Sequence, residues 1–513
     1  MEKKVDEMMV DRIEKIIQQL VEVCLKFVKQ DEKGRFVFED PIDKKEISAH
    51  YGATHAATAF IIRGMAQGDL EILRTGLNML DSILERWEAS SKLHGYHNDF
   101  NNFALCLLID RCSSHIGNRG EKIKATVIST PDSNNPTVNW YPMRWYVNRC
   151  RYEWTGNKIY EDKCLELRKL IAQATYKDGF IDDRTPKGIS FNLQYNVATV
   201  AAMQLLRVRG EEIDLEKEMG ALLCTVAPDG DVNYLGRGTN QIFAWGMWIY
   251  LLETSLQGNI SQALDFLEKQ VFIMIEKENM MLNPWEGSEK YMWWDYHYSS
   301  VYTAHFLLWL ILAKEDSKKA EINPRKINEG DSGVVVVRDE DAFVTWFEGR
   351  KEYLSERGPA IMALWTRKSG IICKGTFGPW QGAFGNKYAP KETTIRNYFG
   401  LAIIKAEKEN EIIEKVARKL GMLFPKYARE LFVPVFAKVN CSICGSKIVL
   451  VWENSRKANF LNVPYINSAV ITINGKEYSL ESLRTMKIRN QYGWINVAQI
   501  PIPSRKKLVV EIE

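Results

Sequence analysis

Residues 191–203 read FNLQYNVATVAAM, a polar and aromatic opening followed by an alanine-rich apolar run. Apolar residues spaced three and four apart are typical of a helix rather than a strand. Five further segments have the same texture: YGATHAATAF from residue 51, NDFNNFALCL from 98, PMRWYVNRCR from 142, RGTNQIFAWGMW from 237 and HYSSVYTAHFLLWL from 297. Their intervals of 44 to 60 residues leave room for two helices and their loops, so the chain is predicted to contain six helical hairpins.

The stretches between these segments are more charged and more clearly amphipathic. Residues 69–89 (DLEILRTGLNMLDSILERWEA) and 163–174 (KCLELRKLIAQA) carry one polar face, which suits helices of an outer layer. Asp178-Gly179 and Asp229-Gly230 are turn signals ahead of two of the six segments. The predicted N-terminal domain, residues 1–325, is therefore an incomplete toroid of the (α/α)6 type, with inner helices surrounded by outer ones.

The residue pattern of the sequence changes near residue 325. Segments such as SGVVVVRD (332–339) and KLVVEIE (507–513) are short, β-branched and bounded by turn residues, which predicts strands. One helical stretch, KENEIIEKVARKLGMLF (408–424), interrupts them. The prediction for residues 326–513 is a separate antiparallel β-sandwich domain.

Composition excludes several classes of protein. The 513 residues are 46% hydrophobic and 26% charged with a net charge of +3, so neither nucleic acid nor a membrane is an expected partner. Residues up to Phe27 form an amphipathic pattern instead of a signal peptide, and a complete chain of this kind is expected in the cytoplasm. Cys441 and Cys444 have zinc-ligand spacing but lack a second pair, so no metal or other cofactor is expected.

Aromatic residues gather in the loops at one end of the predicted toroid. Aromatic rings stack on sugar rings while tolerating a wet, polar ligand, so these loops predict a carbohydrate-binding cleft. The residues predicted to bind a glycan through their rings are Trp140, Tyr141, Tyr234, Trp245, Trp294 and, in the Gly-rich loop 375–388, Trp380. Trp245 has an alternative interpretation, because aromatic residues at helical spacing more often face a core.

Two junctions between loop and inner helix carry a family resemblance: DGFIDD followed by FNLQYNVATVAAM (178–203), and GDVNYLGRGTNQIFAWG (230–246). Together with the layout of helices and strands, they resemble the polysaccharide lyases of the heparinase II/III-like and alginate-lyase-like architecture. The resemblance implies cleavage of a uronate-containing oligosaccharide or polysaccharide by β-elimination.

That chemistry requires the uronate carboxylate to be neutralised, a base that removes the C5 proton and an acid that protonates the leaving oxygen. The candidates for neutralisation are Asn98, Asn139, Arg237, Asn240 and Gln241. The acid and base candidates are Tyr195, His297, Tyr298 and His97. All seven histidines precede residue 306, so a catalytic histidine from the β-rich domain, which some lyases of this class use, is excluded.

Two other functions remain open. Helical toroids also host glycoside hydrolases, which need two carboxylates facing each other across a cleft. The carboxylates near the predicted loops are Glu153, Asp182, Asp183, Asp231 and Asp295. The third possibility is a glycan-binding protein without catalysis, because one fold hosts many functions.

Overall fold

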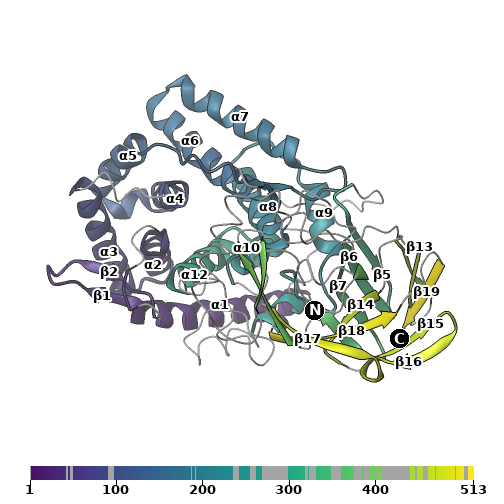
Figure 1. Ribbon diagram of the computed structural model, residues 1–513. Helices are drawn as coiled ribbons and strands as arrows, with labels where there is room; N and C mark the ends of the chain where they lie inside the picture. The colour runs from purple at the N-terminus through teal and green to yellow at the C-terminus, as the bar shows by residue number, and fades with distance from the viewer. Residues whose placement is uncertain are drawn as a thin grey trace.

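The computed structural model describes most of the chain. The described residues are 2–41, 44–46, 50–89, 97–185, 188–190, 192–234, 242–254, 261–268, 299–317, 322, 331–347, 360–374, 384–385, 392–398, 401–405, 439–444, 447–453, 460–467, 469–490, 493–501 and 507–513. Helices fill the part of the molecule that precedes residue 318, and sheets follow from residue 331 (Figure 1).

Within the described part of the chain, six helices form an inner ring, in agreement with the predicted repeat. They are α2 (Gly52–Gln67), α4 (Asn98–Ile116), α6 (Tyr141–Thr155), α8 (Leu193–Val208), α10 (Trp245–Thr254) and α12 (Ser299–Glu315). Each packs against the next in chain order, and α12 packs against α2. The toroid was predicted to be incomplete, and this part of the prediction is wrong, because the contact between the last and the first inner helix closes the ring.

Outer helices cover this ring. They are α1 (Glu2–Phe27), α3 (Leu70–Ala89), α5 (Arg119–Ser129), α7 (Lys158–Ala174) and α9 (Glu216–Cys224), and residues 261–268 are also helical. The outer helices α3, α5, α7 and α9 pack on the inner helices that precede them, and α1 packs on α12. Short hairpins lie between helices: β1 (Val28–Gln30) with β2 (Phe36–Phe38), and β3 (Asp183–Thr185) with β4 (Gly188–Ser190).

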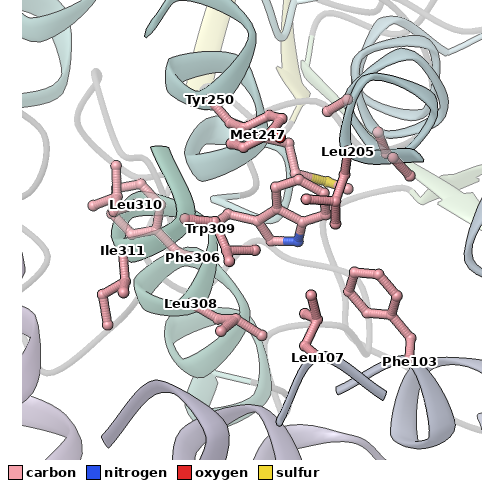
Figure 2. Close-up of a cluster of buried hydrophobic side chains, with 14 of the residues drawn as sticks. Phe103, Leu107, Leu205, Met247, Tyr250, Phe306, Leu308, Trp309, Leu310 and Ile311 are labelled. Atoms are coloured by element: carbon pink, nitrogen blue, oxygen red, sulfur yellow. The ribbon is translucent and has the colours of Figure 1, made fainter. Parts of the chain in front are cut away.

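The inner helices are buried on nearly all sides, which is why their sequences are apolar all round. In α12, the whole run from Ser299 to Ala313 is buried. Figure 2 shows Trp309 of this helix among side chains from its neighbours. Its ring lies parallel to that of Phe103 at 6.1 Å and edge-on to that of Tyr250 at 5.2 Å. Large rings from opposite sides of the toroid therefore fill its axis.

Among its described residues, the β-rich part contains three sheets. The four-stranded sheet has the order β5 (Val334–Arg338), β6 (Ala342–Phe347), β7 (Ala360–Thr366), β8 (Gly370–Lys374). The six-stranded sheet has the order β11 (Leu401–Lys405), β10 (Glu392–Tyr398), β17 (Arg484–Asn490), β18 (Gly493–Pro501), β14 (Phe460–Tyr465), β9 (Phe384–Gly385). The five-stranded sheet has the order β12 (Val439–Cys444), β13 (Lys447–Glu453), β19 (Lys507–Ile512), β15 (Val470–Ile473), β16 (Lys476–Ser479).

One hydrophobic core joins these sheets, with Trp346, Val463 and Ile471 among its members. The predicted β-sandwich is not confirmed, because the strands divide among three sheets. Pairing is antiparallel with one exception among the described strands, the parallel pair of β10 and β17. The predicted helix at 408–424 lies outside the described residues, as does most of the predicted domain boundary: α12 ends at Glu315 and β5 begins at Val334.

Candidate functional site

The N-terminal ends of the inner helices meet at one end of the ring. Each outer helix returns the chain antiparallel to the inner helix before it, so successive inner helices run in the same direction. Free backbone N–H groups and positive partial charge gather where such helices begin. The side chains at the starts of α2, α4 and α6 therefore lie close together, although they are far apart in the sequence.

His97, immediately before α4, contacts a ring from each neighbouring inner helix. The centroid of its imidazole lies 4.0 Å from that of His50, which precedes α2, with 32° between the planes. Its other neighbour is Trp140, which precedes α6, at 5.3 Å and 28°. Since α4 lies between α2 and α6 in the ring, these two partners come from the two inner helices that flank α4.

A second group of rings packs against His97 and its neighbours. Tyr51 stacks on Phe100 with centroids 4.4 Å apart, and Phe243 stacks on His305 at 4.5 Å. Tyr195 of α8, the predicted acid or base, meets Phe243 edge-on at 6.3 Å and is only partly buried. His305 is fully buried in the core.

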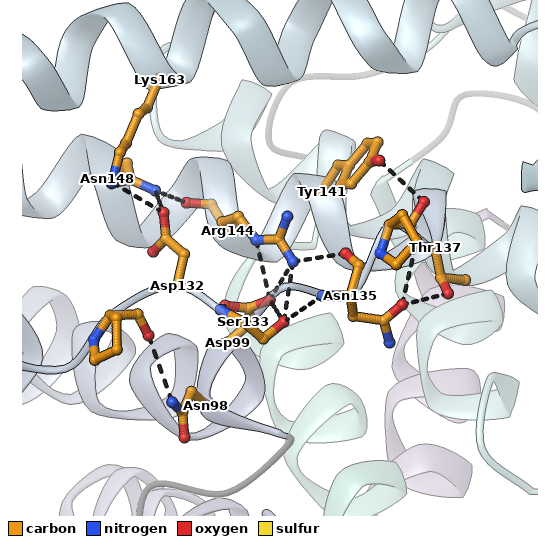
Figure 3. A network of polar contacts seen from close by, with 12 residues as sticks. Asn98, Asp99, Asp132, Ser133, Asn135, Thr137, Tyr141, Arg144, Asn148 and Lys163 are labelled. Carbon is orange, nitrogen blue, oxygen red and sulfur yellow. Dashed lines mark hydrogen bonds and ion pairs between the residues drawn. The ribbon is translucent and has the colours of Figure 1, made fainter. Parts of the chain in front are cut away.

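The loop before α6 is held by a buried ion pair. Arg144 donates from Nε and Nη2 to Oδ2 of Asp99, at 3.0 and 2.7 Å, and also from Nη2 to the carbonyl of Asn135 at 2.9 Å. Ser133 donates from its backbone N–H and its hydroxyl to the same carboxylate (Figure 3). Tyr141 donates its phenol to the carbonyl of Pro136 at 2.9 Å. These bonds fix the loop that carries Asn139 and Trp140.

Asp182 and Asp183 are both buried, and Asp183 contacts the loop that carries Asn139 and Trp140. Oδ1 of Asp183 accepts the backbone N–H of Asn139 at 3.0 Å, and Oδ2 of Asp182 accepts the phenol of Tyr176 at 3.3 Å. The preceding turn is fixed by Asn196, whose amide bonds both the N–H and the carbonyl of Ile181. This turn brings two carboxylates to the end of the ring where α6 and α8 begin.

The turn at Asp229-Gly230 has a different role, although it repeats the turn at Asp178-Gly179. Lys374 of β8 donates to Oδ2 of Asp231 at 2.8 Å and to Oδ2 of Asp229 at 2.6 Å. Burial lowers the pKa of Lys374, but the two carboxylates more than offset this effect and raise it overall. Asp231 is therefore committed to joining the helical and β-rich parts of the molecule.

Two predicted sugar-binding residues are buried in hydrophobic packing, which contradicts their assignment. Tyr234 is fully buried, donates its phenol to the carbonyl of Thr225 at 2.6 Å and contacts Oγ1 of Thr345 at 2.8 Å, so it joins the toroid to β6. Trp245 is 1% exposed and stacks on Phe266 at 4.9 Å. Neither ring has a face available to a sugar.

Glu153, a candidate for the hydrolase mechanism, lies near the C-terminal end of α6, away from the end where the inner helices begin. It pairs there with Arg209 at 2.6 Å. The predicted residues that do come together are His97, Asn98, Asn139, Trp140 and Tyr141. Several predicted residues lie outside the described part of the chain: Arg237, Asn240, Gln241, Trp294, Asp295, His297, Tyr298 and Trp380.

His50 was not among the residues predicted from the sequence, yet its ring centroid lies closer to that of His97 than the centroids of Trp140 and Tyr51 do. A signal was present in the repeat, because His50 directly precedes the first inner segment as His97 precedes the second. Aligning the residues just before each inner helix identifies this pair. Within the described residues, no three His, Cys, Asp or Glu side chains are grouped as a metal site would require, and no helix is long and apolar enough to cross a membrane.

No known family model matches the chain, and no curated protein matches its sequence. Weak structural similarity exists to a possible member of the GH105 family from Salmonella enterica, at 9% identity and a TM-score of 0.40, covering 60% of this chain and 94% of that one. The GH76A α-1,6-mannanase from Salegentibacter sp. HEL1_6 is 12% identical with a TM-score of 0.38, over 58% of this chain and 98% of that one. The Lin0763 protein from Listeria innocua is 13% identical with a TM-score of 0.40, over 59% of this chain and 97% of that one. Similarity at this level assigns no activity to the chain.

Proposed function

We propose that the protein is a glycan-cleaving enzyme that hydrolyses a glycosidic bond at the end of the ring where the inner helices begin. The observation that carries the proposal is the position of Asp182 and Asp183. Both carboxyl groups are buried, and Asp183 is bonded directly to the backbone of Asn139, the chain neighbour of Trp140.

Glycoside hydrolysis uses two carboxyl groups, one that protonates the leaving oxygen and one that attacks or activates water. Asp182 and Asp183 are neighbours in the chain and supply two buried carboxyl groups at this end of the ring. We assign the proton-donor role to Asp182, whose partner is the phenol of Tyr176. Asp183 accepts a backbone N–H, a bond that suits the ionised partner.

Two buried amides next to these carboxylates support a polar ligand. Oδ1 of Asn98 and Oδ1 of Asn139 bond to no group within the described residues. Buried polar atoms in native proteins are nearly always satisfied, so a bound sugar hydroxyl is a suitable partner. His97 and Trp140 are the chain neighbours of these two asparagines; their rings stack on each other at 5.3 Å, and the indole is 7% exposed.

A second reaction, β-elimination on a uronate, is favoured by one observation. The imidazole of His97 lies beside the amides of Asn98 and Asn139, the residue types that remove a C5 proton and neutralise a carboxylate. Tyr195 would then protonate the leaving oxygen, with Arg237, Asn240, His297 and Tyr298 as further candidates. A uronate-containing glycan is the substrate in this case.

One experiment separates these reactions. The purified protein is incubated with neutral and uronate-containing oligosaccharides, and both new reducing ends and the ultraviolet absorbance of an unsaturated uronate are followed. Hydrolysis predicts reducing ends without absorbance, and a loss of about 100-fold or more in Asp182→Asn and Asp183→Asn. The matched control, Glu153→Gln, removes a carboxylate from the far end of α6 and keeps activity.

The other results are equally specific. Absorbance that rises with cleavage and disappears in Tyr195→Phe or His97→Gln establishes elimination in place of hydrolysis. Binding without either signal identifies a glycan-binding protein, and cleavage that survives both aspartate replacements contradicts the proposed acid and base.

A further inference from the structure

The side-chain amide of Asn196 bonds backbone groups on two segments of the chain. Its Oδ1 accepts the N–H of Ile181 at 2.6 Å. Its Nδ2 donates to the carbonyl of Ile181 at 3.0 Å and to the carbonyl of Asn192 at 3.0 Å. The side chain is 2% exposed and lies near the start of α8. Asn196 therefore bonds both the N–H and the carbonyl of one residue, as a neighbouring antiparallel strand would.

Ile181 directly precedes the two proposed catalytic residues. The turn before it is closed by its own backbone, because Tyr176 donates its N–H to the carbonyl of Phe180 at 2.8 Å. Asp182 in turn donates its N–H to the carbonyl of Ala174 at 2.9 Å. These bonds set the shape of the turn, whereas its orientation against α8 depends on contacts with that helix.

Hydrophobic packing alone gives this orientation little precision. Phe180 and Leu193 of α8 belong to one buried cluster, and Ile181 belongs to the core of the toroid. Burial of apolar surface has no direction, whereas hydrogen bonds prefer angles above about 150°. Asn196 therefore fixes the peptide groups on both sides of Ile181, and with them the direction in which the side chain of Asp182 leaves the backbone.

We propose that Asn196 is a positioning residue for the proposed hydrolysis: it orients Asp182 and Asp183 by bonding the N–H and the carbonyl of Ile181. This inference rests on the proposed function and adds a residue outside the predicted set. In this role Asn196 does not touch the sugar and acts through the turn. Its place in an inner helix has a cost, because asparagine is a weak helix former and its amide must be desolvated.

The repeat shows which of the bonds of Asn196 belong to the start of a helix. His55 in α2 and Asn101 in α4 occupy the equivalent position, and each bonds the carbonyl four residues earlier, as Asn196 does. The other bond of Asn101 is to the hydroxyl of Thr54, on the neighbouring inner helix. Among these three residues, the double contact with the backbone of Ile181 belongs to Asn196, so the geometry of a helix start does not account for it.

Kinetics test the proposal on the oligosaccharide of the panel that the wild type cleaves. Asn196→Leu keeps a side chain of similar size and removes both bonds to Ile181. A misplacement of about 1 Å can lower a rate about 100-fold, so kcat is expected to fall about 10- to 100-fold. KM is expected to change less than about twofold, because the bonds lost are not bonds to the sugar.

Thr199→Val is the matched control. Thr199 is also buried in α8, and its hydroxyl donates to the carbonyl of Tyr195 at 2.7 Å. This variant loses a buried hydrogen bond of the same helix without releasing the turn, so its kcat stays at the wild-type value. A fall in kcat of the same size in both variants would assign the effect to α8 as a whole and overturn the proposal.

The backbone amide of Ile181 gives a second readout, which needs no substrate. The full-length chain is labelled with 15N-isoleucine, and the signal is identified by its loss in Ile181→Val. The bond to Asn196 predicts slow hydrogen exchange of this amide in wild type and in Thr199→Val, and faster exchange in Asn196→Leu. Equal exchange in wild type and Asn196→Leu would show that Asn196 does not hold the turn.

A second variant, Asn196→Asp, covers the case in which Asn196→Leu does not fold. A carboxylate accepts hydrogen bonds but donates none, so the N–H of Ile181 stays bonded while its carbonyl is released. The expected fall in kcat is about tenfold, and a wild-type kcat in the variant that folds contradicts the proposal. A wild-type protein that cleaves no oligosaccharide refutes the proposed function, whereas exchange of the Ile181 amide tests the contact with Asn196 separately.

Discussion

Nζ of Lys374 lies 2.8 Å from Oδ2 of Asp231, and both side chains are almost completely buried where β8 meets the loop before α10. The two residues are 143 positions apart in the sequence. This ion pair fastens the four-stranded sheet to the same end of the toroid that carries the candidate site, and it is one of several bonds that do so.

Replacing Lys374 by Met is expected to destabilise the protein by about 3–5 kcal/mol, because Asp231 stays buried and loses its cation. The measurement is urea unfolding followed by circular dichroism. Lys368→Met is the matched control, since Lys368 pairs with Glu513 at the surface and is expected to contribute about 0–1 kcal/mol. Equal stability of the two variants would show that the buried pair does not join the two parts.

Two buried histidines on the ring axis predict an acid-sensitive core. Burial lowers the pKa of His55 to about 3 and, together with His55, lowers the pKa of His305 well below its usual value. Above about pH 6.5 both the folded and the unfolded chain are neutral at these positions. Below it only the unfolded chain takes up protons, so stability falls by about 2 kcal/mol per histidine between pH 6.5 and pH 5.

Urea unfolding at pH 7 and pH 5 measures this loss. The double variant His55→Gln, His305→Gln is expected to show a smaller dependence on pH, whereas His115→Gln, which changes an exposed histidine, keeps the wild-type dependence. An undiminished dependence in the double variant would assign the acid sensitivity to other groups.

The glycines of the two repeated turns are expected to resist substitution. Gly179 and Gly230 have φ of +88° and +93°, and a Cβ on either would lie 2.5 Å from a backbone carbonyl oxygen, that of Lys217 or Gln262. Gly179→Ala therefore combines backbone strain with overpacking and is expected to cost about 2–5 kcal/mol in unfolding free energy. Gly210→Ala separates the two effects, because Gly210 has φ +108° but open space around it, and it should cost about 1–2 kcal/mol.

Asp99→Asn tests the support of the loop that carries Trp140. Without the charge of Asp99, Arg144, which is only 11% exposed, loses its carboxylate partner. The free energy of unfolding is therefore expected to fall by about 3–5 kcal/mol. Hydrogen exchange of residues 133–137 should accelerate, since Ser133 loses its charged acceptor. Asp81→Asn removes a more exposed partner of Arg119 and serves as control; unchanged exchange in Asp99→Asn would separate this network from the loop.

The sequence by itself determined the helical hairpins and their order. Periodicity, turn residues and the contrast between apolar and amphipathic helices are local properties, so the inner helices near residues 51, 98, 142 and 191, the turn at Asp178-Gly179 and the strand-rich C-terminal part were all predictable. The same signals placed His97, Asn98, Asn139 and Trp140 at helix starts, where they meet.

Only the tertiary structure decided what these residues contact. Closure of the ring between α12 and α2, the three sheets and the parallel pair of β10 and β17 depend on packing between distant segments. The same packing buries Tyr234 against β6 and pairs Asp231 with Lys374. It also brings His50 into contact with His97. Burial stabilises surfaces that meet in space, and a local sequence pattern does not indicate which surfaces will meet.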